Sequence, residues 1–303
     1  MSPAPLPFSV PHPSHLLSNE PMSKHTAVRL GGPADWLYTA RESSDELAAV
    51  VGAAWVANVP VRVLGGGANV LVSDAGVRGL IVLNHVTSVE FQGERVRVSA
   101  GHSLTTLARK CAARGLAGFE WAASVPGTLG GAVVNNAGAH GGDMAGNLES
   151  ADVLDAERGR ITLTLNDLAF GYRTSVLKAR TDRRFLVLGA LLRLTPGDPA
   201  AISARIDEFV AYRKRTQPPG ASLGSIFKNP PGDYAGRLIE ACGLKGIAVG
   251  GVQVSPVHGN FFIHRGGADA ADYSALIDRV QAEVLAQTGV RLEPEIERLG
   301  DWA

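Results

Sequence analysis

VRVLGGGANV, residues 61–70, begins as a β-strand pattern and runs into three consecutive glycines. Glycines leave backbone N–H groups uncovered, so such a run can form a concavity that binds an anion such as a diphosphate. An ordinary dinucleotide-binding fingerprint needs a glycine at Val70 and a long helix after it, but the chain continues LVSD. There is also no P-loop pattern, GxxxxGK[ST]. The stretch therefore predicts a diphosphate loop of another kind, with a glycine-rich hairpin as the simpler alternative.

A second glycine-rich stretch, ASVPGTLGGAVVNNAGAHGG, spans residues 123–142. Its side chains are small, and His140 is its only ionisable group. A flat aromatic cofactor needs such a wall, because bulky side chains would keep the ring away from the backbone. The alternative is a helix of small residues that packs closely on a sheet.

Composition excludes several classes of protein. The 303 residues carry 29 basic and 29 acidic side chains, so net charge favours neither nucleic acid nor an anionic membrane as a partner. The two cysteines form no CxxC pair, and His12 and His15 have no third ligand nearby, so we expect no metal site. Neither a membrane-spanning apolar run nor a basic signal-peptide start is present, which predicts a cytoplasmic protein.

Strand and helix patterns mix along the whole chain, which predicts an α+β fold. Ser43 and Ser103 are expected helix N-caps, and Gly289 is expected to end the last helix. Cys111 and Cys242 fall on apolar helix faces, as core thiols would. PGDP at 196–199 marks a boundary. We predict a disordered tail at 1–20 and three domains at 21–85, 86–197 and 198–303.

Six motifs in order resemble the UDP-N-acetylenolpyruvoylglucosamine reductase (MurB) family. They are HTAVRLGGP (25–33), LGGGANVL (64–71), the stretch 125–142, FGYR (170–173), GSIFKNP (224–230) and LEPE (292–295). The resemblance implies an FAD-binding fold of the vanillyl-alcohol-oxidase type, made of two α+β subdomains, and a C-terminal α+β substrate domain. It also implies non-covalent FAD, NADPH as hydride donor, and reduction of an enolpyruvyl UDP-sugar in peptidoglycan precursor synthesis.

The same resemblance assigns site residues. Arg173 would stabilise the charge that develops on the substrate carboxylate, Ser225 would donate a proton, and Glu295 would polarise the enolate or relay a proton. The implied cofactor residues are Gly65, Gly66, Gly67, Ala68, Asn69, Pro126, Gly127, Thr128, Gly131, Asn136 and Gly138. The implied substrate residues are Tyr172, Lys228, Asn229, His258 and Asn260.

One departure from the family pattern is Ala68, where the family usually has serine, at a cost of about 0.5–1.5 kcal/mol if one hydroxyl bond to the diphosphate is lost. The chain also resembles the shorter subclass of the family, which lacks an inserted loop over the substrate. We expect a monomer. Two alternatives stay open: an oxygen-dependent oxidase of the same flavin fold, and a flavin- or sugar-nucleotide-binding module without catalysis.

Overall fold

The computed structural model describes residues 3–302, which divide into two compact units. The first unit comprises residues up to Ser18, Trp36–Gly65 and Gly79–Tyr212, and the second comprises Asn19–Asp35, Gly66–Arg78 and the chain from Arg213 onward. Both units are assembled from separated segments of the chain, whereas the three predicted domains are continuous ranges. The boundaries at residues 20, 85 and 197 therefore stay a prediction.

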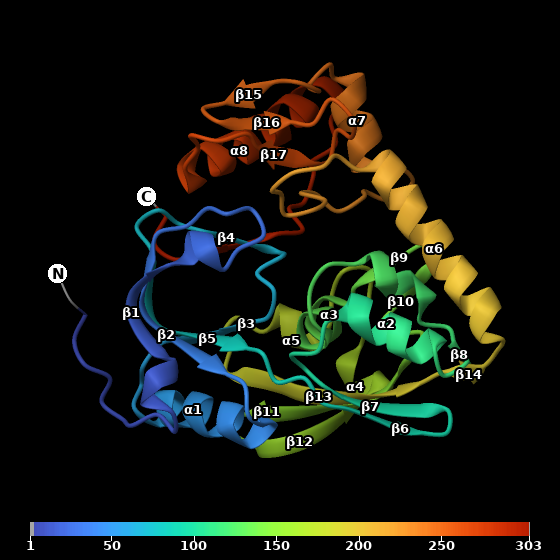
Figure 1. Ribbon diagram of the computed structural model, residues 1–303. Helices are drawn as coiled ribbons and strands as arrows, with labels where there is room; N and C mark the ends of the chain where they lie inside the picture. Colours follow the sequence, from blue (N-terminus) through green and yellow to red (C-terminus); the bar gives the residue numbers. More distant parts are fainter. Residues whose placement is uncertain (1–2, 303) are drawn as a thin grey trace. The chain divides into compact units, whose positions relative to one another are not determined.

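An antiparallel five-stranded sheet in the order β12-β11-β13-β7-β6 forms the centre of the first unit (Figure 1). Helices α2 and α3 and the 3-10 helix η3 supply apolar residues to the core beside it. Ser103 caps α2 as predicted, because its side chain accepts from the Thr106 N–H. The elements are β6 Val89–Gln92, β7 Arg95–Ser99, α2 Leu104–Ala112, β8 Leu116–Ala117, η3 Glu120–Ser124, α3 Leu129–Asn135, β9 Gly138–Ala139, β10 Gly142–Asp143, β11 Leu148–Asp155, β12 Gly159–Thr164, α4 Leu165–Leu168, α5 Val176–Ala179, β13 Phe185–Arg193, β14 Thr195–Pro196 and α6 Pro199–Thr216.

A four-stranded sheet in the order β1-β2-β5-β3 belongs mostly to the same unit. Strands β3 and β5 are parallel, and α1 supplies the apolar face that covers them. Ser43 caps α1 by accepting from the Glu46 N–H, as predicted. The elements are η1 Pro13–His15, β1 Leu16–Pro21, η2 Met22–Lys24, β2 Pro33–Ala40, α1 Ser44–Val56, β3 Val61–Leu64 and β5 Val77–Asn84.

The amino-terminal segment differs from the disordered tail predicted for residues 1–20. Residues 13–21 form η1 and β1, and β1 is an edge strand of the four-stranded sheet. Two contacts hold the preceding residues: the Trp36 indole N–H donates to the Ala4 carbonyl at 2.9 Å, and Val10 is buried in the core beside α1. Local composition does not reveal these contacts, because both depend on residues later in the chain.

The second unit has a three-stranded sheet, β15-β16-β17, against which α8 packs. The Asp74 carboxylate accepts from the Ala270 and Ala271 N–H groups at the start of α8, and Gly289 ends the helix in the left-handed conformation, as predicted. Cys242 is only half-buried, at the C-cap of α7. The elements are β4 Val70–Val72, α7 Ala235–Ala241, β15 Ala248–Val249, β16 Val252–Val254, β17 Phe262–His264, α8 Ala270–Thr288 and β18 Glu297–Leu299.

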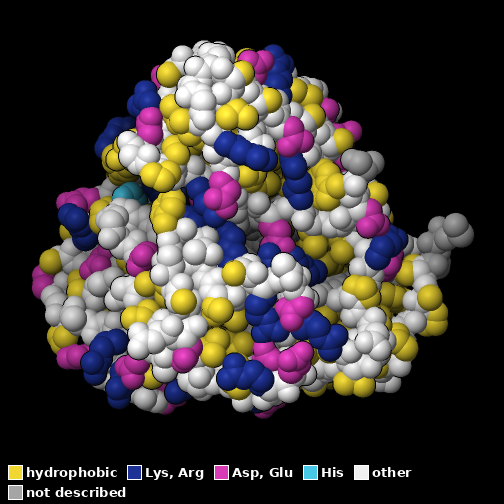
Figure 2. Space-filling model, turned by 180° about the vertical axis from the view of Figure 1, so that it is seen from behind, with side chains coloured by type: hydrophobic (Ala, Val, Ile, Leu, Met, Phe, Trp, Pro, Cys, Tyr) yellow, Lys and Arg dark blue, Asp and Glu magenta, His cyan; other side chains and the backbone are white. Residues whose placement is uncertain are grey.

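Surface and core agree with the balanced composition. Basic and acidic side chains are interspersed over the face shown in Figure 2. Cys111 is buried, and burial raises the pKa of its thiol to about 12, which suits a core residue. Between residues 3 and 302, no helix is long and apolar enough to cross a membrane, and no cluster of three His, Cys, Asp or Glu side chains could hold a metal ion.

Candidate active site

The two glycine-rich stretches meet within the first unit at Gly65 and Thr128. A Cβ added to Gly65 would lie 2.1 Å from the Thr128 Oγ1 atom, so only glycine allows this approach. Thr128 also forms an isolated β-bridge with Ser103, the N-cap of α2. The end of β3 is therefore in contact with the segment predicted to form the cofactor wall.

Open space borders the backbone of this wall at two glycines. A Cβ added to Gly127 or to Gly131 would meet no described atom within 4 Å, and Gly127 has a φ of +117°. Hydrogen bonds fix the segment from behind, because Leu104 donates to the Gly127 carbonyl and Leu129 donates to the His102 carbonyl. A rigid backbone bordered by open space is the surface that a planar ring system requires.

Asn136 joins the wall to the FGYR segment. It is buried with a φ of +43°, and its amide donates to the Gly171 carbonyl at 3.0 Å and to the Asp143 carboxylate at 3.3 Å. Its carbonyl oxygen accepts from the Ala145 N–H at 3.0 Å. These bonds give Asn136 a supporting role, and its predicted contact with a cofactor stays a prediction.

Arg173 occupies a strained position in a tight turn. Gly171 and Thr174 pair through reciprocal backbone hydrogen bonds of 3.1 and 3.3 Å, which places Tyr172 and Arg173 at the tip. Arg173 has a φ of +54°, a conformation that costs a residue other than glycine roughly 1–2 kcal/mol and that clusters at functional sites. Its guanidinium donates to the Gly138 carbonyl at 2.7 Å and lies 5.3 Å from the Tyr172 ring centre. The wall thus orients the arginine.

In the second unit, the Ser225 motif and the LEPE segment are neighbouring backbone segments. Glu295 donates its N–H to the Ile226 carbonyl at 2.7 Å, and Lys228 donates its N–H to the Glu293 carbonyl at 2.8 Å. Within residues 3–302, the Ser225 hydroxyl is used in no hydrogen bond, although its backbone forms a bridge with Phe261. The structure therefore brings the proposed proton donor and the proposed catalytic carboxylate onto adjacent segments.

Asn260 holds the backbone of the Ser225 motif by hydrogen bonds. Its side chain is 3% exposed, accepts from the Phe227 N–H at 2.9 Å and donates to the Phe227 carbonyl at 2.7 Å. This two-bond contact fixes the peptide groups on both sides of Phe227. The sequence predicted Asn260 as a substrate contact, but its side chain presents almost no surface to a ligand.

Three other predicted substrate residues, Lys228, Asn229 and His258, each have a hydrogen-bond or ion-pair partner within the protein. The Lys228 ammonium pairs with the exposed Glu293 carboxylate. The Asn229 carbonyl oxygen accepts from the Ala235 N–H at the start of α7. The His258 ring accepts from the Asn260 N–H, and burial lowers the pKa of His258. Their contacts with a substrate stay predictions.

The last part of the glycine loop also belongs to the second unit. The Gly67 carbonyl accepts from the Ala27 N–H, and the Asn69 side chain donates to the Glu295 carbonyl at 3.2 Å. None of these contacts uses an N–H group of Gly66, Gly67 or Ala68. The loop therefore fits the requirement for a diphosphate, which accepts hydrogen bonds from backbone donors.

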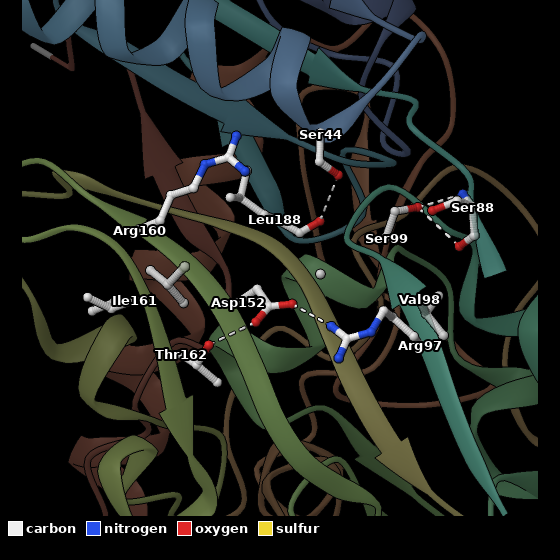
Figure 3. A pocket seen from close by; sticks show the side chains of 12 residues that line it. Ser44, Ser88, Arg97, Val98, Ser99, Asp152, Arg160, Ile161, Thr162 and Leu188 are labelled. Carbon is white, nitrogen blue, oxygen red and sulfur yellow. Dashed lines mark hydrogen bonds and ion pairs between the residues drawn. The ribbon is translucent and has the colours of Figure 1, made fainter. Parts of the chain in front are cut away.

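A separate cavity of about 350 Å³ lies on the sheet of the first unit (Figure 3). Arg97 pairs there with Asp152, which also accepts from the Thr162 hydroxyl, and Arg160 pairs with Asp45. Both guanidinium groups therefore already have carboxylate partners. None of the residues predicted for the active site lines this cavity.

The comparisons with known proteins agree with this geometry. A family profile described as "UDP-N-acetylenolpyruvoylglucosamine reductase, C-terminal domain" matches residues 216–299, and one described as "FAD binding domain" matches residues 37–164. The reductase of Rubrobacter xylanophilus is 44% identical over 286 residues, which are 93% of this chain and 95% of that protein. The chain belongs to the UDP-N-acetylenolpyruvoylglucosamine reductase family. The resemblance to this family that the six sequence motifs indicated is confirmed.

Two further relatives extend the match. The reductase of Chloroflexus aggregans is 44% identical over 292 residues, which are 94% of this chain and 97% of that protein. The solved reductase of Thermus caldophilus superposes with a TM-score of 0.80 at 35% identity, over 92% of this chain and 97% of that one. These findings confirm the α+β, FAD-binding fold of the vanillyl-alcohol-oxidase type. The protein is an FAD-dependent oxidoreductase.

His102 is a residue beside the cofactor wall that sequence reasoning missed. It is 2% exposed; its Nε2 atom lies 3.2 Å from the Lys110 ammonium, and its carbonyl accepts from Leu129 of the wall. Burial lowers its pKa, and Lys110 lowers it further. A lone histidine before a helix gives no signal of this pairing in the sequence.

Proposed function

We propose that this protein reduces UDP-N-acetylglucosamine enolpyruvate to UDP-N-acetylmuramate with NADPH, in peptidoglycan precursor synthesis. The observation that carries the proposal is the placement of Ser225 and Glu295 on adjacent segments, which the bond from the Glu295 N–H to the Ile226 carbonyl joins. An oxidase or a binding module gives no reason to place this serine and this glutamate on neighbouring backbone segments. Cytoplasmic location, a monomeric state and non-covalent FAD belong to the same proposal.

Bound FAD, once reduced by NADPH, would supply a hydride to the methylene carbon of the enolpyruvyl group. The protein must then perform two tasks. It must stabilise the negative charge that develops on the substrate carboxylate, and it must donate a proton to the carbon next to that carboxylate. In the first unit, Gly127 and the open face at Gly131 would contact the flavin ring, and in the second unit the N–H groups at Gly66 and Gly67 would bind the diphosphate.

Arg173 fits the first task. A guanidinium stays protonated and pairs a carboxylate through two parallel hydrogen bonds. The bond to the Gly138 carbonyl and the turn at Gly171 hold the side chain before the substrate binds, so little reorganisation is needed when charge develops.

Ser225 fits the second task as the proton donor. A serine hydroxyl is a weak acid, so groups near it must stabilise the alkoxide that remains. The Lys228 ammonium, three residues along the same segment, is one such group, although it is shared with Glu293. Glu295 would act protonated or through a water molecule, because an ionised carboxylate would repel the charge that forms.

Stopped-flow absorbance tests the proposal in two half-reactions. Wild-type protein with FAD should bleach with NADPH under argon and recover its colour when the enolpyruvyl sugar nucleotide is added. Ser225→Ala should bleach normally but recover about 10²–10⁴-fold more slowly, as expected for loss of a positioned acid. A protein that takes up no FAD, or a Ser225→Ala variant that recovers at the wild-type rate, would overturn the corresponding assignment.

A further inference from the structure

We infer that Asn69 is a positioning residue for Glu295. Through Asn69, the glycine-rich loop at residues 65–69 sets the backbone geometry of the LEPE segment at residues 292–295. The inference rests on the proposed function and deepens it. The family resemblance placed Asn69 among the cofactor residues, but its side chain amide donates to the Glu295 carbonyl at 3.2 Å. Both residues belong to the second unit.

Glu295 is fixed on both sides of its Cα atom. Its N–H donates to the Ile226 carbonyl at 2.7 Å, and its carbonyl accepts from Asn69. Since the two flanking peptide planes determine the direction of the Cα–Cβ bond, these two bonds together fix the point from which the Glu295 side chain extends. The first ties Glu295 to the Ser225 motif, and the second ties it to the glycine loop.

Asn69 makes a further contact with the same segment. The Glu297 N–H donates to the Asn69 carbonyl at 3.0 Å, and from this point β18 continues parallel to β4, with Glu297 opposite Val70. One asparagine thus contacts the segment through its side chain at Glu295 and through its backbone at Glu297. A change in the conformation of the loop that carries Asn69 is therefore transmitted directly to the peptide plane that follows Glu295.

The loop itself is held firmly on its other side. Gly67 has a φ of +59°, and a Cβ added there would lie 2.2 Å from the His25 carbonyl. The Gly67 carbonyl accepts from the Ala27 N–H. The 25–27 segment therefore limits the movement of the loop, so a diphosphate bound to its N–H groups would fix the position of Asn69. Binding of the cofactor would thus order the carboxylate that acts on the substrate.

Asn69→Leu tests this role, because leucine is similar in size to asparagine and removes the amide donor without placing a negative charge beside the diphosphate loop. We expect FAD affinity and the rate of bleaching by NADPH to stay within about twofold of wild type. Recovery of colour on adding the enolpyruvyl substrate should slow by about 10–100-fold, the scale of a misplaced catalytic group. The pH profile of the recovery step should shift, because it reports groups that act in that step.

Ser73→Ala is the matched control. The Ser73 hydroxyl donates to the Asp301 carbonyl at 2.5 Å and so ties β4 to the chain after β18, at the end remote from Glu295. The Ser73→Ala protein should be less stable than wild type, but its bound flavin should recover colour at the wild-type rate.

Three results would overturn the inference. Recovery of Asn69→Leu at the wild-type rate would remove the positioning role. Loss of FAD affinity with a normal recovery rate per bound flavin would make Asn69 a cofactor ligand. An equal slowing in Ser73→Ala would assign the effect to strand pairing. Failure of the proposed function is distinguishable, because wild-type protein would then not recover at all.

Discussion

Replacing Gly131 by alanine separates contact with the flavin from stability of the fold. Gly131 lies in α3, and a Cβ added there meets no atom within 4 Å among the described residues. The unliganded protein therefore has room for the methyl group. Because alanine has a higher helix propensity than glycine, the free energy of unfolding of the apoprotein should rise by up to about 1 kcal/mol.

The bound cofactor should respond in the opposite direction. A flavin ring that lies against this backbone would meet the new methyl group, and overpacking of this kind costs about 1–3 kcal/mol. FAD affinity should therefore fall by roughly 5- to 150-fold, since 1.4 kcal/mol corresponds to a factor of ten. Urea denaturation of the apoprotein and titration of FAD by quenching of its fluorescence measure the two effects separately.

Gly52→Ala is the matched control for this experiment. Gly52 lies within α1, and a Cβ added there also meets no atom within 4 Å. It should stabilise the apoprotein to a similar degree and leave FAD affinity unchanged. A Gly131→Ala protein that binds FAD as tightly as wild type would refute the placement of the flavin against α3.

Two other predictions follow from strain and from burial. Arg173→Gly should lower kcat by about 10²–10³-fold, as for the loss of an oxyanion-type donor. Thermal stability should stay nearly unchanged, because glycine adopts a φ of +54° without strain. A loss of kcat under tenfold in steady-state assays would contradict the role of Arg173. Burial lowers the pKa of His102 below its ordinary value of 6.5, so the unfolded chain binds a proton that the folded one does not, and stability should fall as the pH drops below about 6.5. His102→Gln should make that decline shallower in urea titrations at pH 7.5, 6.5 and 5.5, and an unchanged slope would show that His102 is not responsible.

The sequence predicted the elements that depend on local chemistry. Ser43 and Ser103 cap their helices because a serine oxygen can accept from an N–H three residues ahead, and Gly289 ends α8 because it adopts a positive φ. In each case the information lies within a few residues or in the residue type.

Contacts over long distances in the sequence could not be predicted in this way. Asn69, Asn136 and Asn260 were all expected to contact a ligand, which stays a prediction; the structure adds that each side-chain amide bonds to the protein backbone, at Glu295, Gly171 and Phe227 respectively. An asparagine offers both donors and acceptors, so its residue type does not reveal which partner it has. The family resemblance supplied the list of site residues, and only the folded chain distinguishes those that support the site from those that face it.

The parallel pairing of β4 with β18 has a consequence for the biogenesis of the enzyme. Val70 pairs with Glu297, far along the chain, so this sheet cannot form before β18 has been synthesised. The loop that precedes β4 is synthesised long before the strand that pairs with β4. Loss of Glu297–Leu299 would therefore leave β4 without a partner and disturb the glycine-rich loop that precedes it.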